Sequence, residues 1–167
     1  MLDELVKLLK YKSWANNITF SALSSVDDVE LYKNRQTHFK NILMTLNHVY
    51  VVDDIFKSHL LSKKHGYSSR NTDTCSSFSR LWEQQKVIDN WYIDFISALE
   101  EGSIADQINF EFVGGGDGTM SIAEIVFHIV NHGTYHRGFV SDLMYQIPVT
   151  PPANDMTVYL RDIYKVN

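Results

Sequence analysis

The sequence contains very little cysteine and no long apolar run. Cys75 is the only cysteine among 167 residues, so no intrachain disulfide can form, and this fits a reducing compartment. No apolar run approaches the roughly 20 residues that a membrane-spanning helix requires. The N-terminal segment, residues 1–7, is amphipathic and acidic, unlike a signal peptide. These absences predict a cytoplasmic protein that does not enter a membrane.

Positive charge is sparse as well. The chain has 15 Lys and Arg against 20 Asp and Glu, which gives a formal net charge of −5, and its basic residues form no long run. Electrostatic binding of nucleic acid needs clustered Lys and Arg, so the composition argues against it. Apolar residues make up 44% and charged residues 21% of the chain, as in soluble globular proteins. We expect one domain over residues 1–167, burying about 70% of the surface of the unfolded chain.

Apolar residues at helical spacing predict an all-α fold. They predict four long helices, over residues 2 to about 23, about 37–61, about 75–101, and from 119 or 121 to about 146. Residues 24–30 are predicted as a polar connection, and Gly102 is placed as the stop of the third helix. A short final helix is expected over about 156–164, capped by Asn154 or Asp155. Four amphipathic helices of this length favour a four-helix bundle.

One segment before the last long helix has a different pattern. Residues 107–113 alternate polar and apolar side chains and lead into Gly-Gly-Gly-Asp-Gly, residues 114–118. This predicts a short extended insert or small hairpin with a turn. The glycine cluster lacks the Gly-Lys-Ser/Thr ending of a phosphate-binding loop. Ser121 and Glu124 then form a capping-box pattern at the start of the helix.

Three histidines recur at steps of four in that last long helix: His128, His132 and His136. A step of four returns to nearly the same helix face, so adjacent members can close on one metal ion. The outer two lie two turns apart, about 12 Å along the axis, which is too far for one ion to bind all three. The metal-binding pair is therefore either the first two histidines or the last two.

A pair of histidines needs a third ligand from another helix. His48 is the best candidate, because it lies in the middle of the second predicted helix among apolar residues. Three imidazoles with an open position are the arrangement of catalytic zinc sites, and imidazole also suits nickel, copper and iron. His59 and His65, near the end of that helix, are expected to be exposed. Tyr11, Trp14 and two neighbouring asparagines form a cluster that faces a pocket or anchors an amphipathic helix.

These motifs resemble one known family. The segment His132-Gly-Thr-Tyr-His136-Arg137-Gly138, preceded by Ile125-Val-Phe-His128-Ile-Val-Asn131, is similar to the signature helix of the DinB/YfiT-like metalloenzymes, a family of damage-inducible proteins. Weaker similarities are spread over most of the chain, in order: Tyr11-Lys-Ser-Trp14-Ala-Asn16, residues 42–53 around His48, and Pro151-Pro152-Ala-Asn-Asp155. Two departures are Phe139, where the family commonly has glutamine, and Gln146-Ile147, where a glycine is often found.

The resemblance implies a fold and a ligand set. It implies a four-helix bundle of DinB/YfiT-like type that binds one divalent metal ion, nickel or zinc, through His48, His132 and His136. His128 then becomes a packed neighbour, a residue that lines the pocket or a group that supports the ligands. Imidazole ligands are commonly oriented through their other ring nitrogen, and the side chains expected near the site for such a role, or to line the pocket, are Asp53, Asn131, Glu124 and Trp14. Arg137 is expected to form a structural ion pair.

The resemblance also implies function. Characterised relatives include thiol-dependent transferases, so one hypothesis is a metal-dependent enzyme that joins a low-molecular-weight thiol to a small electrophile; hydrolysis by a bound water is a second possibility. A non-catalytic metal-binding protein of the stress response, or an interaction protein, is the alternative. A structural domain with vestigial histidines is the third hypothesis. A homodimer is expected from the resemblance alone, and Cys75 is expected to be packed rather than a nucleophile.

Overall fold

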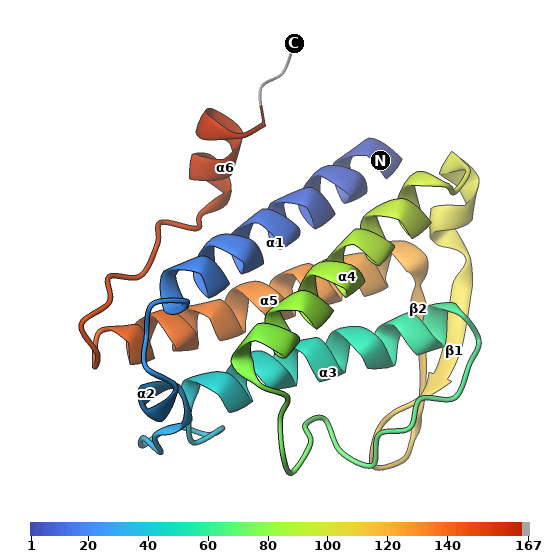
Figure 1. Cartoon of the computed structure of the whole chain (residues 1–167). Helices are drawn as coiled ribbons and strands as arrows, with labels where there is room; N and C mark the ends of the chain where they lie inside the picture. The colour runs from blue at the N-terminus through green and yellow to red at the C-terminus, as the bar shows by residue number, and fades with distance from the viewer. Residues whose placement is uncertain (165–167) are drawn as a thin grey trace.

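A computed structural model describes residues 1–164, so the last three residues of the predicted domain lie outside the described chain. Four long helices dominate it: α1 (Leu2–Leu23), α3 (Ile42–Leu60), α4 (Phe78–Ser97) and α5 (Ile122–Met144). Helix α1 packs against α4 and α5, and α3 packs against the same two helices. The four helices therefore enclose a common interior (Figure 1). The predicted all-α architecture is confirmed.

The predicted insert is a two-stranded hairpin. Strands β1 (Gln107–Glu111) and β2 (Asp117–Ser121) pair antiparallel, with Gln107 opposite Ser121 and Glu111 opposite Asp117. Three consecutive glycines in the turn, residues 114–116, have φ near +97° to +99°, a conformation that side chains rarely adopt. The hairpin leads directly into α5 through the predicted capping box, since the Ser121 amide donates to Glu124 Oε2 at 2.7 Å. The start of α5 is therefore set by its own sequence.

Several predicted boundaries were wrong. The polar connection contains a short helix, α2 (Asp28–Tyr32), because Asp27 caps it and Leu31 is completely buried. Helix α3 begins at Ile42 rather than near residue 37, since Lys40 has a φ of 69° and Asn41 caps the helix.

The ends of the remaining helices also differ from the prediction. Helix α4 begins after Ser77, whose hydroxyl accepts from the Arg80 amide, and it ends at Ser97. Gly102 does not stop it but lies in a 3-10 helix, η1 (Glu101–Ala105). At the C-terminal side, α5 ends at Met144 and α6 (Met156–Asp162) begins as predicted. Propensity alone does not locate such ends, because side-chain caps and local burial decide them.

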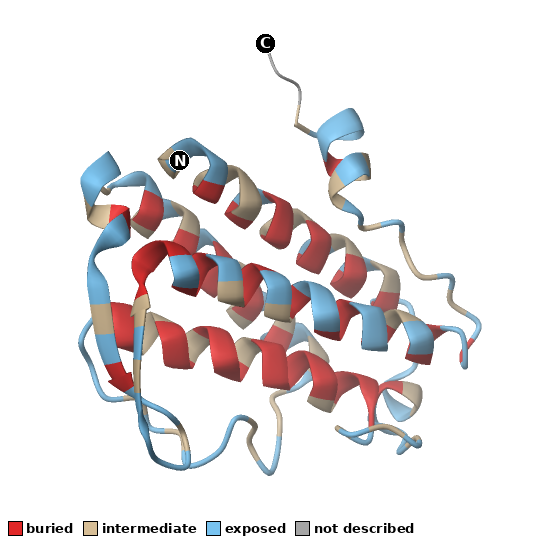
Figure 2. Ribbon diagram, turned by 180° about the vertical axis from the view of Figure 1, so that it is seen from behind, coloured by how far each residue is buried: buried red, intermediate tan, exposed pale blue. Residues whose placement is uncertain are grey.

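The interior is divided into two apolar clusters with a polar level between them. One cluster contains Leu9, Ile88 and Ile125, and the other contains Phe20, Leu43 and Val140. Along each long helix, buried polar side chains occupy positions between the members of the two clusters: Lys12 and Asn16, His48 and Asp53, Gln85 and Asp89, and His136 and Arg137. Buried positions face inward along all four helices (Figure 2). Within residues 1–164, none of the helices has the length and apolarity needed to span a bilayer.

Candidate metal centre

Three of the predicted histidines meet at this polar level. Helix α5 presents His132 and His136 from successive turns, and the adjacent helix α3 presents His48. One ligand atom from each ring lies within 4.8 Å of the other two. The ring centroids are separated by 4.5 Å (His132–His136), 4.6 Å (His48–His136) and 4.9 Å (His48–His132). The bundle thus brings together side chains that are 84 residues apart in the sequence.

The ring nitrogens of this cluster fit a divalent cation. His48 Nε2 and His132 Nε2 face each other at 3.0 Å, close to the roughly 3.3 Å that separates two imidazole nitrogens on a tetrahedral zinc ion with bonds of about 2.0–2.1 Å. The Nδ1 atoms of His132 and His136 are buried without a hydrogen-bond partner in the described chain. Buried polar atoms are normally satisfied, so hydrogen bonds within the described chain do not saturate these two imidazoles.

Burial keeps these imidazoles neutral. Together with the neighbouring imidazoles, it lowers the pKa of His132 to about 2 and the pKa of His136 to about 4. The pKa of His48 is also lowered, mainly by burial and further by the positive charge of Arg70. A neutral imidazole has a free lone pair, which is the form that binds metals. At neutral pH, protons therefore compete little for this cluster.

A backbone carbonyl selects the tautomer of His48. Its Nδ1 donates to the carbonyl oxygen of Arg70, so Nδ1 carries the proton and the lone pair remains on Nε2, which faces His132. Phe39 stacks on the same ring at 4.3 Å and approaches His136 edge-on at 5.5 Å. The imidazole is therefore held by a hydrogen bond on one edge and by an aromatic ring on one face.

The carboxylates and amide predicted to orient the imidazoles make other contacts. Asp53 is fully buried, and its Oδ2 accepts from Lys12 Nζ at 2.7 Å and from Gln85 Nε2 at 2.9 Å. Glu124 caps α5, and Asn131 is exposed. Among the described residues, none of the three hydrogen-bonds to a histidine of the cluster. The backbone carbonyl of Arg70, in the connection between α3 and α4, orients His48 in their place. Sequence patterns do not reveal such a contact, because every residue has a backbone carbonyl.

Two further predicted residues lie in aromatic surroundings. The ring of His128 stacks 5.6 Å from His132 and 4.7 Å from Phe56, and it makes no hydrogen bond to residues 1–164. It therefore packs beside the cluster and also lines a cavity next to it. Trp14 packs against Tyr159 of α6 and lines a separate cavity together with residues of α4, so it does not contribute to the histidine site.

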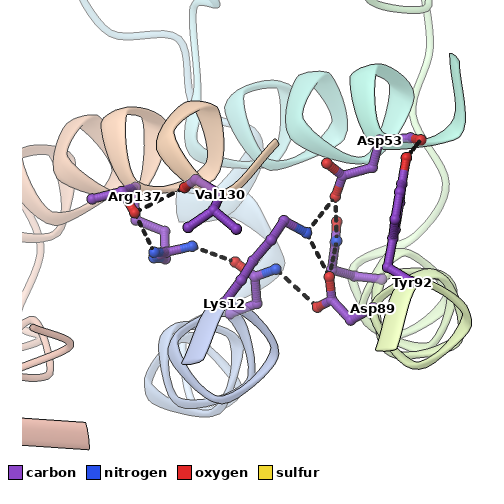
Figure 3. Close-up of polar contacts among 9 residues, drawn as sticks. Lys12, Asp53, Asp89, Tyr92, Val130 and Arg137 are labelled. Atoms are coloured by element: carbon purple, nitrogen blue, oxygen red, sulfur yellow. Dashed lines mark hydrogen bonds and ion pairs between the residues drawn. The ribbon is translucent and has the colours of Figure 1, made fainter. Parts of the chain in front are cut away.

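The predicted ion pair of Arg137 is absent from the described chain. Arg137 is 2% exposed, and its guanidinium donates to Asn16 Oδ1 and to Thr134 Oγ1 at 2.9 Å each. Asn16 in turn donates to Asp89, which also accepts from Lys12 at 2.6 Å. Arg137 is thus linked to the carboxylate of Asp89 through the side-chain amide of Asn16, as Figure 3 shows. The role is structural, as expected, but the partner is neutral.

Two cavities meet at the histidine cluster. One, of about 550 Å³, has hydroxyl and amide side chains on its wall, including Thr37, Ser69 and Asn71; we call it the polar cavity. The other, of about 510 Å³, is lined by aromatic rings, including Phe56, Phe110 and Phe112; we call it the aromatic cavity. Both share five residues, His48, Arg70, Val113, Tyr135 and His136, so a molecule in either one reaches the cluster.

The sequence did not reveal most of this lining. His59 was expected to be exposed, but it is 9% exposed and stacks on Phe110 at 4.7 Å in the wall of the aromatic cavity. A signal for its burial was available, since it lies four residues after Ile55 on the apolar face of α3. Arg70 and the hairpin phenylalanines come from irregular or extended segments, whose placement depends on the assembled bundle.

Comparisons with known proteins agree with this architecture. The chain is similar to Protein DinB of Bacillus subtilis (strain 168), with 27% identity over 173 residues that cover 96% of this chain and 95% of the relative. Its fold is similar to the crystal structure of a DinB-like protein from Bacillus cereus ATCC 10987, with a TM-score of 0.72 and 14% identity over 90% of this chain and 95% of the other. The model of the DinB family matches residues 1–164. With a family match over almost its whole length, the chain belongs to the DinB family.

Proposed function

We propose that this protein is a metal-dependent enzyme that binds one divalent ion through His48, His132 and His136 and transfers a small thiol to an electrophile. The observation that carries the proposal is the meeting of two cavities at the histidine cluster, because a buried structural metal site needs no such access. Cavities of this size accommodate small organic molecules. Nickel and zinc both suit three imidazoles.

Different residues of the site bind the metal ion and the electrophile. The three imidazoles, neutral at physiological pH, hold the ion, and a bound divalent ion favours the deprotonated form of a coordinating thiol or water. Phe56 and Phe110 give the aromatic cavity an apolar wall, which suits the carbon skeleton of an electrophile. In the net reaction the thiol sulfur forms a bond to the electrophilic carbon, the leaving group departs with the electron pair of its bond, and the thiol proton passes to solvent.

The nucleophile comes from outside the chain in this proposal. Cys75 is half-buried, and neither cavity includes it in its lining. Burial raises the pKa of its thiol, which disfavours the reactive thiolate. A low-molecular-weight thiol therefore supplies the sulfur, and a water molecule in the same place would make the protein a hydrolase.

Metal analysis of the purified protein tests the site. We expect about one equivalent of nickel or zinc in the wild type, little in His48→Ala and His132→Ala, and an unchanged amount in His128→Ala, which alters the same helix face without removing a ligand. Equal metal content in His132→Ala and the wild type would contradict the ligand assignment. All variants are checked for helical content, so that unfolding is not mistaken for ligand loss.

Activity assays test the reaction class. The metal-loaded protein is incubated with several thiols and aromatic electrophiles, and separately with activated esters in the absence of thiol. Thiol-dependent product supports the transferase, and ester hydrolysis alone favours a hydrolase. Bound metal without turnover in either assay supports the alternative, a metal-binding stress-response or interaction protein. The homodimer and the cytoplasmic location stay predictions, tested by sedimentation and by fractionation of cells.

A further inference from the structure

Among residues 1–164, no negative side chain lines the two cavities at the cluster. The chain has 20 Asp and Glu against 15 Lys and Arg, yet within the part that the structure describes no carboxylate lines either cavity. The charged side chain that both cavities share is Arg70. An acidic protein thus presents a positive opening at its candidate metal centre, and a bound cation would add to that charge.

Arg70 is free to bind a ligand. Its side chain is exposed, and it makes no ion pair or side-chain hydrogen bond with residues 1–164. By contrast, Arg35 is committed to Glu30 at 2.6 Å. The guanidinium also lies close enough to the cluster for its charge to contribute to the lowered pKa of His48, after the larger effect of burial.

The segment that carries Arg70 is anchored to α3. The backbone carbonyl of Arg70 accepts from His48. The next residue, Asn71, donates from Nδ2 to the carbonyl oxygen of Met44 at 3.0 Å. Asn47 donates to Asn71 Oδ1 at 2.5 Å and to Thr72 Oγ1 at 2.8 Å. Four hydrogen bonds therefore hold this stretch of backbone beside the cluster. A guanidinium on an anchored backbone loses less conformational freedom when it binds an anion.

We propose that the polar cavity binds the carboxylate of an anionic low-molecular-weight thiol, with Arg70 as its main anion-binding side chain. This inference rests on the proposed thiol transfer and specifies the class of thiol. One guanidinium matches one carboxylate through two parallel N–H donors. The hydroxyl of Thr37, in the same wall, adds a neutral donor. The aromatic cavity on the other side of the cluster leaves room for the electrophile.

Two thiols that differ in one carboxylate test the inference. The cobalt(II)-loaded protein is titrated with N-acetylcysteine and with N-acetylcysteamine, which has the same thiol and amide but no carboxylate. The absorption that appears when a thiolate binds cobalt gives each affinity without turnover. We expect the wild type to prefer N-acetylcysteine by about 1.4- to 5-fold, the range for a solvent-accessible charge pair.

The preference for the carboxylate should depend mainly on Arg70. We expect Arg70→Gln to bind the two thiols about equally, and Arg70→Lys to keep part of the preference. Arg80→Gln is the matched control, because Arg80 is exposed on the first turn of α4 and lines neither cavity. Cobalt stoichiometry and thermal melting are measured for each variant.

The possible failures are distinguishable. Equal affinity of the wild type for both thiols, or an unchanged preference in Arg70→Gln, would overturn the anion subsite while leaving thiol binding at the metal intact. A preference that Arg80→Gln also removes would show a general effect of net charge and would likewise overturn the assignment. No thiolate absorption with either compound would overturn the proposed thiol chemistry together with this inference.

Discussion

Replacing Lys12 by methionine is expected to destabilise the protein strongly. Lys12 is 1% exposed, and its ammonium bonds to Asp53 Oδ2 at 2.7 Å and to Asp89 Oδ1 at 2.6 Å (Figure 3). Methionine has a similar length and leaves little cavity, so the change removes the charge rather than the packing. Two buried carboxylates then remain beside each other without a cation.

The loss of unfolding free energy in Lys12→Met can be estimated from these contacts. Removing one partner of a buried ion pair costs about 3–5 kcal/mol, because the other charge stays buried. Gln85 still donates to both carboxylates and Asn16 to Asp89, so we expect the lower end, about 3 kcal/mol. Against a typical stability of about 5–15 kcal/mol, that is a large fraction.

Lys7→Met on the same helix is the matched control. Lys7 forms an ion pair of the same length, 2.7 Å, with Glu4, but Glu4 is 66% exposed. Exposed pairs of this kind contribute about 0.3–0.5 kcal/mol. The two substitutions therefore compare the same change of side chain and the same bond length at different burial.

Denaturant unfolding of the metal-free proteins measures both effects at pH 7 and pH 5. In the wild type, burial raises the pKa of Asp53, and removal of Lys12 raises it further. A carboxyl whose folded pKa lies above its unfolded value gains stability as pH falls. The deficit of Lys12→Met relative to the wild type should therefore shrink at pH 5. A deficit under 1 kcal/mol at pH 7, or one that grows at pH 5, would refute the reasoning.

Other perturbations test the helix start and the cluster. Ser121→Ala should cost about 1 kcal/mol of unfolding free energy, measured by denaturant titration, because it removes half of the capping box with Glu124. Gly133→Ala should cost up to about 2 kcal/mol: an added Cβ would lie 3.1 Å from a guanidinium nitrogen that hydrogen bonds hold in place, an overpacking cost of about 1–3 kcal/mol, and the helix propensity of alanine offsets about 1 kcal/mol of it; a thermal melt no lower than wild type would contradict this. The metal-free protein should lose stability as pH falls below about 6.5, because unfolded histidines bind protons there while burial holds the pKa of His136 at about 4. For that one histidine the loss at pH 5 should be about 1–2 kcal/mol, and His136→Gln should abolish it.

The sequence predicted those parts of the fold that depend on neighbouring residues. The apolar spacing of α5 and the pairing of Ser121 with Glu124 are local, so the helix and its start were both recognisable. The alternating segment and its glycines likewise predicted the hairpin. Boundaries such as the start of α3 were missed, because a cap at Asn41 overrides the helical pattern of the preceding residues.

The candidate site was predictable only in its histidines. Regular spacing marked His132 and His136, and position within an apolar helix marked His48. The side chain of Arg70 and the carbonyl that orients His48 belong to an irregular segment without a pattern of its own. Asp53 appeared to be available for the histidines because the sequence does not show that Lys12, 41 residues earlier, occupies its oxygen.

The buried charged network around Lys12 lies beside the histidine cluster and links the packing of the bundle to the candidate metal site. Lys12 bonds to Asp53 on α3, five residues after His48, and it passes α5 beside Gly133, next to His132. In many proteins, replacing a buried ion pair by well-packed apolar residues leaves stability unchanged or raises it. Stability alone therefore does not explain why charged side chains are buried here. The hydrogen bonds of the network can all form in only one arrangement of the helices, so the network specifies that arrangement. The same arrangement places His48 opposite His132, which explains the buried charges. The loss in Lys12→Met should therefore appear in metal affinity as well as in unfolding. Lys7→Met should leave metal affinity unchanged and lower the free energy of unfolding by only about 0.3–0.5 kcal/mol.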